Sequence, residues 1–220
     1  MADYADKGIT ALIFDFDGTL AEATLDFVRM KREALATMAE HIELPPALDK
    51  KLMEILEGLE DQHGKDALRP VRAAVLETVK RLEIEAAGRS SLFPYVRPML
   101  AECRKRGIKT GIVTRNCREA VRIVFPDVDE HFGCLITRDD VEKVKPDPGH
   151  LLHALDLLGV APEACLMSGD HPMDIIVGKR VGAFTAGLAT GEADFEELAA
   201  ENPDYCVRDG QELMRMLGIV

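Results

Sequence analysis

The sequence lacks several features that would assign a protein class directly. Its five cysteines include no Cys-x-x-Cys pair, which argues against a structural zinc site and a disulfide framework. No apolar run approaches the roughly 20 residues that a membrane-spanning helix needs. The first residues, MADYADKG, are polar and acidic and contain no hydrophobic signal region. From these absences we expect a cytoplasmic protein in a reducing compartment.

Positive charge is also in deficit. The 220-residue chain has 39 acidic and 27 basic side chains, which gives a formal net charge of −12 at pH 7. Such an acidic protein repels nucleic acid and anionic membrane surfaces, so we expect neither as a partner. An anionic substrate would therefore require a local positive charge or a metal ion. The length allows one large domain or a domain with a substantial insert.

Two different patterns divide the chain. Residues 9–15 have the pattern of a strand, and from about residue 92 helical segments alternate with short apolar runs. This alternation predicts a parallel, doubly wound α/β sheet that includes the first strand. Between them, residues 26–87 place apolar side chains at three- and four-residue steps, which is typical of amphipathic helices that pack on one another. We predict that this helical block is an insert after the first strand. The breaks between its helices are expected at Pro45-Pro46 and near Gly64, and the second apolar stripe includes Leu48.

Polar side chains gather where the predicted strands end. In open α/β sheets, ligands bind outside the carboxyl ends of the strands, so these residues are candidates for a site. The first strand, ALIF, runs directly into Asp15 and Asp17. The remaining candidates, in chain order, are Gly18, Thr114, Arg115, Asn116, Lys145, Asp170 and Asp174. Four carboxylates in one place repel one another and favour a hard cation, and Mg²⁺ suits such oxygen ligands.

These residue types suggest phosphoryl transfer. With a metal ion neutralising one oxygen, the Asp15 carboxylate can attack phosphorus, which splits one difficult displacement into two easier steps. Asp17 can protonate the leaving alkoxide and then activate water, and its backbone carbonyl can reach the metal. Thr114, the amide of Arg115 and Lys145 would hold the phosphoryl oxygens. Gly18 would let the chain turn sharply beside the phosphate.

The same residues resemble the four motifs of the haloacid dehalogenase (HAD) superfamily, in order and approximate spacing. The motifs are Asp15-Phe16-Asp17-Gly18-Thr19, Thr114, Lys145-Pro146, and Gly169-Asp170 with Asp174. The resemblance covers nearly the whole chain, and the helical insert looks like the small cap of the phosphoglycolate phosphatase-like branch. It implies a HAD-like Rossmannoid core of residues 1–20 and 92–220, with an α-helical cap inserted at residues 21–91.

The resemblance also implies roles and an activity. Asp15 would be nucleophile and metal ligand, Asp17 acid/base and ligand through its carbonyl, Asp170 a metal ligand, and Asp174 a second acid that supports the metal. The implied enzyme is a Mg²⁺-dependent phosphatase that hydrolyses a small organic phosphate monoester through an aspartyl-phosphate. Members with this cap include phosphoglycolate phosphatases, so 2-phosphoglycolate is the first substrate to test.

Two positions depart from the family's commonest pattern. Arg115 follows the motif threonine where relatives often have asparagine, and Asn116 comes one residue later. Arg115 could bind a carboxylate or phosphate of the substrate, or form a salt bridge to a nearby acid. His171 could touch the leaving group, but a loop histidine at a helix start is the favoured interpretation.

Other functions remain open at this stage. A phosphotransferase or sugar-phosphate mutase of the same superfamily would use identical chemistry at Asp15 with a different acceptor. A non-catalytic homologue that only binds a partner is disfavoured, because such a protein would be expected to lose a catalytic acid and none is missing. The sequence leaves the substrate and the choice between monomer and homodimer undetermined.

Overall fold

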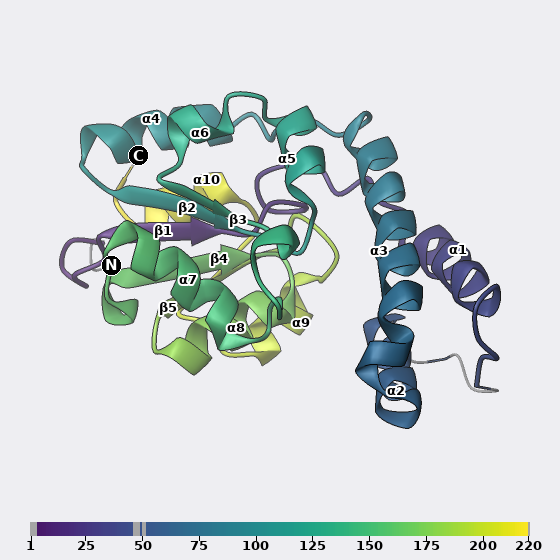
Figure 1. The fold of residues 1–220 in the computed structure, drawn as a ribbon. Coiled ribbons are helices and arrows are strands. Elements are labelled where there is room, and N and C mark those ends of the chain that lie inside the picture. The colour runs from purple at the N-terminus through teal and green to yellow at the C-terminus, as the bar shows by residue number, and fades with distance from the viewer. Residues whose placement is uncertain (1–3, 46–48, 50–51, 220) are drawn as a thin grey trace. The chain divides into compact units, whose positions relative to one another are not determined.

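The chain is built around one parallel β-sheet (Figure 1). The computed structural model describes residues 4–45, 49 and 52–219. The strands are β1 (Ala11–Phe14), β2 (Lys109–Val113), β3 (Cys134–Ile136), β4 (Cys165–Gly169), β5 (Phe184–Leu188) and β6 (Tyr205–Val207). They pair in the order β3-β2-β1-β4-β5-β6, and every pairing is parallel. The predicted doubly wound α/β class is therefore confirmed.

The strand order reverses at β1. From β1 the chain moves outward through β2 to β3, and it then returns to pair β4 with the other side of β1. Phe14, the last residue of β1, lies in register with Ile112 of β2 and Ser168 of β4. The carboxyl ends of these central strands therefore meet at the point where doubly wound folds hold their ligands.

Strand β1 is buried because helices cover both faces of the sheet. Leu12 and Phe14 belong to one hydrophobic cluster with α4 (Val96–Lys105) and α10 (Gly210–Met216). Ile13 belongs to a second cluster with α7 (Pro148–Leu158) and α8 (Pro172–Val181). An apolar run without alternation is what a parallel strand between two helical layers requires.

The connection between β2 and β3 differs in detail from the prediction. The pattern after the IKTGIVT run predicts a helix that starts near Asn116, whereas α5 (Arg118–Val124) starts two residues later and is followed by a short α6 (Val128–His131). The residue before a proline disfavours helical backbone, so Pro126 separates the two helices at Phe125. The last helix between strands is α9 (Phe195–Ala200).

The chain divides into two compact units, one of Met1–Thr24 with Ser90–Val220 and one of Leu25–Arg89. The second unit contains α1 (Phe27–Ala39), α2 (Leu52–His63) and α3 (Lys65–Ala87). Met38, Leu56 and Val75, one from each helix, are buried in its own hydrophobic cluster.

The break between α2 and α3 falls at Gly64, whose φ of +91° suits glycine. Pro46 and Leu48 lie outside the described residues. Among the helices that the structure describes, none is long and apolar enough to cross a membrane.

Candidate active site

The turn after β1 places two aspartates at the central strand ends. The Asp15 amide donates to the Ser168 carbonyl (2.8 Å), so pairing with β4 continues just beyond β1. Gly18 then turns the chain with φ of +76°, and its amide donates to the Ala21 carbonyl (2.7 Å). A Cβ atom at Gly18 would lie 2.3 Å from Oδ2 of Asp170. Glycine is therefore required both by the backbone conformation and by the close approach of this carboxylate.

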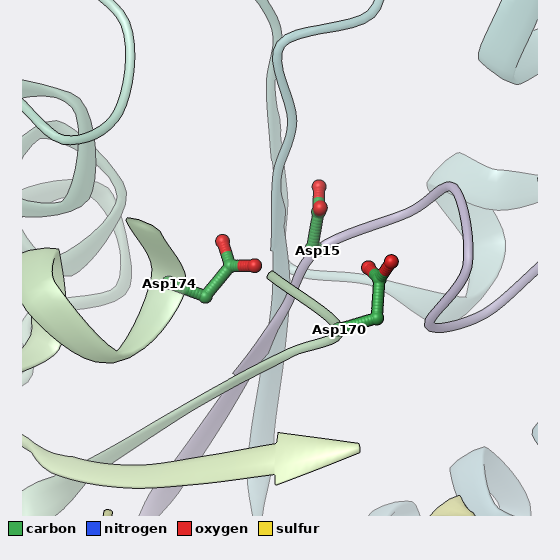
Figure 2. A group of neighbouring side chains, drawn as sticks. All are labelled: Asp15, Asp170 and Asp174. Atoms are coloured by element: carbon green, nitrogen blue, oxygen red, sulfur yellow. The ribbon is translucent and has the colours of Figure 1, made fainter. Parts of the chain in front are cut away.

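Three carboxylates meet beyond the strand ends. Asp15 follows β1, Asp170 follows β4 and Asp174 lies in the first turn of α8, and their side chains point toward a common space (Figure 2). One ligand atom from each residue lies within 4.8 Å of the others. Asp170 is 4% exposed and Asp174 is 1% exposed. Three clustered carboxylate oxygens fit a hard divalent cation such as Mg²⁺.

The electrostatics of this cluster show a shortage of positive charge. Burial, followed by the charges of Asp15 and Asp174, raises the pKa of Asp170 to about 7. Burial is also the main reason that the pKa of Asp174 rises to about 6, while the Lys145 ammonium acts in the opposite direction. Ionising these two carboxyl groups therefore costs free energy in the metal-free protein, and a bound cation would relieve that cost.

Lys145 is the buried cation of the site. Its Nζ lies 2.9 Å from Oδ1 of Asp15 and donates to Oδ1 of Asp174 at 2.6 Å. Burial acts to lower the pKa of Lys145, but the charges of Asp15 and Asp174 outweigh burial and raise it. Lys145 therefore carries its charge into an interior from which a lone ammonium would be excluded.

His150 forms a hydrogen bond to the backbone of the loop that carries Lys145. The Lys145 amide donates to Nδ1 of His150 (3.0 Å), and the histidine is fully buried at the start of α7. Burial, with a smaller effect from the Lys145 charge, lowers the pKa of His150 to about 4. The imidazole is therefore neutral at pH 7, as an acceptor of this hydrogen bond must be. Sequence reasoning did not single out His150.

The second motif orients the second aspartate. Thr114 is buried, and its Oγ1 accepts a hydrogen bond from the Asn116 amide (3.1 Å). Nδ2 of Asn116 donates to Oδ2 of Asp17 (2.8 Å). The Asp17 side chain is therefore outside the three-carboxylate cluster and is held by an amide.

Arg115 follows β2 and its side chain contacts the first turn of α8, whereas His171 lies at the start of that helix. The exposed Arg115 guanidinium donates to Sδ of Met173 (3.4 Å), a weak acceptor. His171 is the N-cap of α8, where its Nδ1 accepts from the Met173 amide (3.1 Å), and Asp174 closes the capping box through the His171 amide. This geometry agrees with the interpretation of His171 as a residue at a helix start.

Several residues support these loops, and of them the sequence analysis named only Thr19, as part of the first motif and without a role. The Asp170 carboxylate accepts from the Thr19 hydroxyl at Oδ1 and from the Glu192 amide at Oδ2, both at 3.0 Å. The Tyr95 hydroxyl donates to the Thr19 carbonyl. The Thr190 hydroxyl donates to the Gly18 carbonyl. The segment after β5 also lies at a carboxyl strand end, so the rule that flagged Asp170 applied to it as well. The contact made by Tyr95, from the turn before α4, has no signal in the sequence.

Comparison with known proteins gives a consistent assignment. A family model described as haloacid dehalogenase-like hydrolase matches residues 9–182. The chain is 30% identical to pyrophosphatase PpaX of Bacillus velezensis, over 97% of this chain and 99% of that protein. It is 28% identical to pyrophosphatase PpaX of Bacillus cereus, over 95% and 96% of the two chains. The structure of a hydrolase from Pseudomonas syringae superposes with a TM-score of 0.72 at 26% identity, covering 96% of this chain and 99% of that one.

The fold and the site together define a hydrolase with a clustered acidic centre at the ends of a doubly wound sheet. The family model covers most of the chain, so this protein belongs to the haloacid dehalogenase-like hydrolases. The predicted superfamily and the predicted enzyme class are therefore confirmed.

Proposed function

We propose that this protein is a Mg²⁺-dependent phosphatase that forms a covalent phosphoenzyme at Asp15. The observation that carries the proposal is the environment of the Asp15 carboxylate. Its Oδ1 lies 2.9 Å from the Lys145 ammonium, and one of its oxygens lies within 4.8 Å of ligand atoms on Asp170 and Asp174. A carboxylate between an ammonium group and a cation site can approach an anionic phosphoryl group that the rest of this acidic protein repels.

The residues support a two-step reaction. An Asp15 oxygen attacks phosphorus while the bond from phosphorus to the leaving oxygen breaks, and Asp17 donates a proton to that oxygen. In the second step Asp17 accepts a proton from water, which attacks the phosphoryl group and releases phosphate and Asp15. Bound Mg²⁺ would supply the charge that balances the carboxylates and the phosphoryl oxygens. Lys145 and Thr114 would hold the phosphoryl group during both steps, and Asn116 keeps Asp17 oriented.

Two substrates are the leading candidates. The resemblance to the phosphoglycolate phosphatase-like branch suggests 2-phosphoglycolate, and the name of the relatives, pyrophosphatase, suggests inorganic pyrophosphate. Both molecules carry a second anionic group beside the transferred phosphoryl group.

Arg115 is the candidate to bind that second group. Within the part of the chain that the structure describes, its guanidinium contacts the Met173 thioether and forms no ion pair with a carboxylate. The salt-bridge alternative for Arg115 therefore has no support, whereas a substrate carboxylate or phosphate would give its fork of donors a charged partner.

Phosphate release from three compounds tests the proposal. With Mg²⁺, we expect turnover of 2-phosphoglycolate or pyrophosphate and slower turnover of methyl phosphate, which lacks the second anion. EDTA should abolish the activity, Mg²⁺ should restore it, and Ca²⁺ should inhibit because its larger, looser coordination misplaces the nucleophile. Arg115→Gln should raise KM for 2-phosphoglycolate and pyrophosphate, which carry a second anionic group, and leave KM for methyl phosphate unchanged. Activity that persists in EDTA would contradict the proposal.

A phosphosugar added to the same assay tests the alternative activity. A mutase would convert it into its isomer, and a phosphotransferase would pass the phosphoryl group to a second acceptor, in both cases without releasing free phosphate. A phosphatase uses water as acceptor and releases phosphate.

We also propose that the helical unit Leu25–Arg89 corresponds to the predicted cap of residues 21–91. Its separation as a compact all-helical unit supports this assignment. Replacing residues 25–89 by the equivalent segment of a relative should change the preference between 2-phosphoglycolate and pyrophosphate. An unchanged preference would contradict the assignment.

A further inference from the structure

The carboxylates of the cluster are held in different ways. Asp174 forms an ion pair with Lys145 at 2.6 Å. Within the described residues 4–45, 49 and 52–219, Asp170 forms no ion pair with a lysine, arginine or histidine, although its carboxylate is almost fully buried. An uncompensated buried carboxylate would turn away from its neighbours unless neutral groups fixed it. The residues that fix Asp170 therefore decide whether it can act as a ligand.

Besides Thr19, the segment that follows β5 fixes Asp170. The Glu192 amide donates to Oδ2 of Asp170 (3.0 Å), and the Ala193 amide donates to its backbone carbonyl (3.3 Å). The Thr190 hydroxyl donates to the Gly18 carbonyl in the turn after β1. We call Thr190, Gly191, Glu192 and Ala193 the 190–193 segment. It connects the ligand-bearing loop after β4 to the nucleophile-bearing loop after β1.

Gly191 makes this arrangement sterically possible. A Cβ atom at Gly191 would lie 1.9 Å from Oδ2 of Asp170 and 2.9 Å from the Cα of Gly18. From the other side, a Cβ at Gly18 would lie 2.3 Å from the same oxygen. The carboxylate thus lies in a slot between two glycine backbones. Gly191 is not among the described glycines with positive φ, so its backbone conformation would accept alanine and the restriction is steric.

The hydrogen bonds leave both carboxylate oxygens able to bind a cation. Oδ1 accepts from the Thr19 hydroxyl and Oδ2 accepts from the Glu192 amide, one donor each. Each oxygen of an ionised carboxylate has a second lone pair, which remains for a metal ion. Neutral donors at this position orient the ligand without competing for the charge of the cation.

We propose that the 190–193 segment positions Asp170 for divalent-cation binding, with Gly191 and Thr190 as its positioning residues. The proposal rests on the metal site of the proposed function. The Glu192 amide fixes one oxygen of Asp170, Gly191 gives the carboxylate its slot, and Thr190 ties the segment to the Gly18 turn. A change in this segment alters cation affinity without removing any ligand.

Titration calorimetry with Mg²⁺ in the absence of substrate tests the proposal. Gly191→Ala should weaken Mg²⁺ binding by about tenfold or more, as losses around metal ligands typically do. Thr190→Val should weaken it severalfold, and Thr190→Ser, which keeps the hydroxyl, should restore it. Gly58→Ala is the matched control, because a Cβ there meets nothing within 4 Å, and its Mg²⁺ affinity should equal that of the parent. Circular dichroism of each metal-free variant establishes that it is folded.

The outcomes distinguish the role of the 190–193 segment from the existence of the metal site. Mg²⁺ binding by the parent together with an unchanged affinity in folded Gly191→Ala would overturn the role of the segment and leave the metal site intact. Absence of Mg²⁺ binding in the parent would overturn both. If Gly191→Ala does not fold, the Thr190→Val and Thr190→Ser pair decides, and equal affinities in these two variants would overturn the proposal.

Discussion

The two units of the molecule treat their charged side chains in opposite ways. In the helical unit, Glu33 accepts from Arg29 and Arg81, and Glu85 accepts from Arg29 and Arg89. Hydrogen bonds from these arginines are the largest effect on both glutamates, and they lower the pKa of each.

At the strand ends of the α/β unit the direction is reversed. Burial and crowding raise the pKa values of Asp170 and Asp174, and one lysine serves two carboxylates. Exposed ion pairs such as those of Glu33 and Glu85 are typical of a solvated helical surface. Buried carboxylates with strongly perturbed pKa values cluster at functional sites, and this difference distinguishes the strand-end cluster from the paired glutamates of the helical unit.

The largest expected effect comes from removing the nucleophile. Asp15→Asn should reduce kcat by about 10³-fold or more, because the amide cannot form the acyl phosphate. Initial rates of phosphate release measure this loss. Asp129→Asn, which removes an exposed carboxylate paired with Arg122, serves as the control and should keep the parent rate. Near-normal activity in Asp15→Asn would contradict the mechanism.

Removal of the buried ammonium should have the next largest effect. Lys145→Met leaves Asp15 and Asp174 without their shared cation, and we expect kcat to fall by about 10²-fold or more. Lys143→Met changes an exposed lysine two residues away and should leave kcat unchanged. An equal kcat in the Lys145→Met and Lys143→Met variants would show that Lys145 does not act on the reacting group.

A smaller loss of kcat is expected when the residue that orients Asp17 is removed and Asp17 itself is kept. Asn116→Ala removes the donor to Oδ2 of Asp17 at 2.8 Å, and we expect kcat to fall by about tenfold with KM changed less. Steady-state kinetics separate the two parameters. A change confined to KM would show that Asn116 binds substrate and does not orient Asp17.

The pH dependence of the free energy of unfolding, measured on the metal-free protein, distinguishes the two units further. The folded-state pKa of Asp170, about 7, lies above its ordinary value of 3.8, so between these pH values the folded protein binds more protons than the unfolded chain. Its contribution to stability therefore falls as the pH rises through this window. In EDTA, Asp170→Asn should be more stable than the parent at pH 8 by on the order of 2 kcal/mol, and the gain should shrink at pH 5.

Glu33 of the helical unit serves as a control with the opposite expected pH dependence. The pKa of Glu33 is lowered, so its stabilising contribution is present at neutral pH and is lost as the pH falls. Glu33→Gln should thus differ from the parent at pH 8 and converge with it in acid. Urea unfolding of the three proteins at both pH values provides the measurement, and the same pH trend for both substitutions would contradict the distinction between the units.

The smallest effect is expected from the exposed ion pairs. Arg29→Gln breaks hydrogen bonds to Glu33 and Glu85, but exposed pairs of this kind contribute little. We expect kcat and KM to remain at the parent values and the melting temperature to change little. A large increase in KM would show instead that Arg29 binds the substrate.

Sequence reasoning predicted the parts of this molecule that depend on local pattern. The unbroken apolar run of β1 and the following Asp15 indicated a central parallel strand with a site at its end. Asp170 and Asp174 could be placed beside Asp15 because parallel strands end at one edge of the sheet.

The contacts between distant segments could not be predicted in this way. The support of Asp170 by Thr190, Gly191 and Glu192 depends on β5 lying next to β4, which spacing alone does not specify. The approach of His150 to the Lys145 amide depends on the path of a loop, and a lone histidine in a helix carries no distinguishing signal. The break between α5 and α6, in contrast, has a local cause, because Pro126 disfavours helical backbone at Phe125.

The most direct test of the central claim is a crystal structure of the Mg²⁺-loaded protein soaked with beryllium fluoride, a mimic of the phosphoryl group on aspartate. The account predicts beryllium bonded to a carboxylate oxygen of Asp15, with Lys145 contacting a fluorine and Mg²⁺ held among Asp15, Asp170 and Asp174. An occupied cation position with no adduct on Asp15 would contradict it.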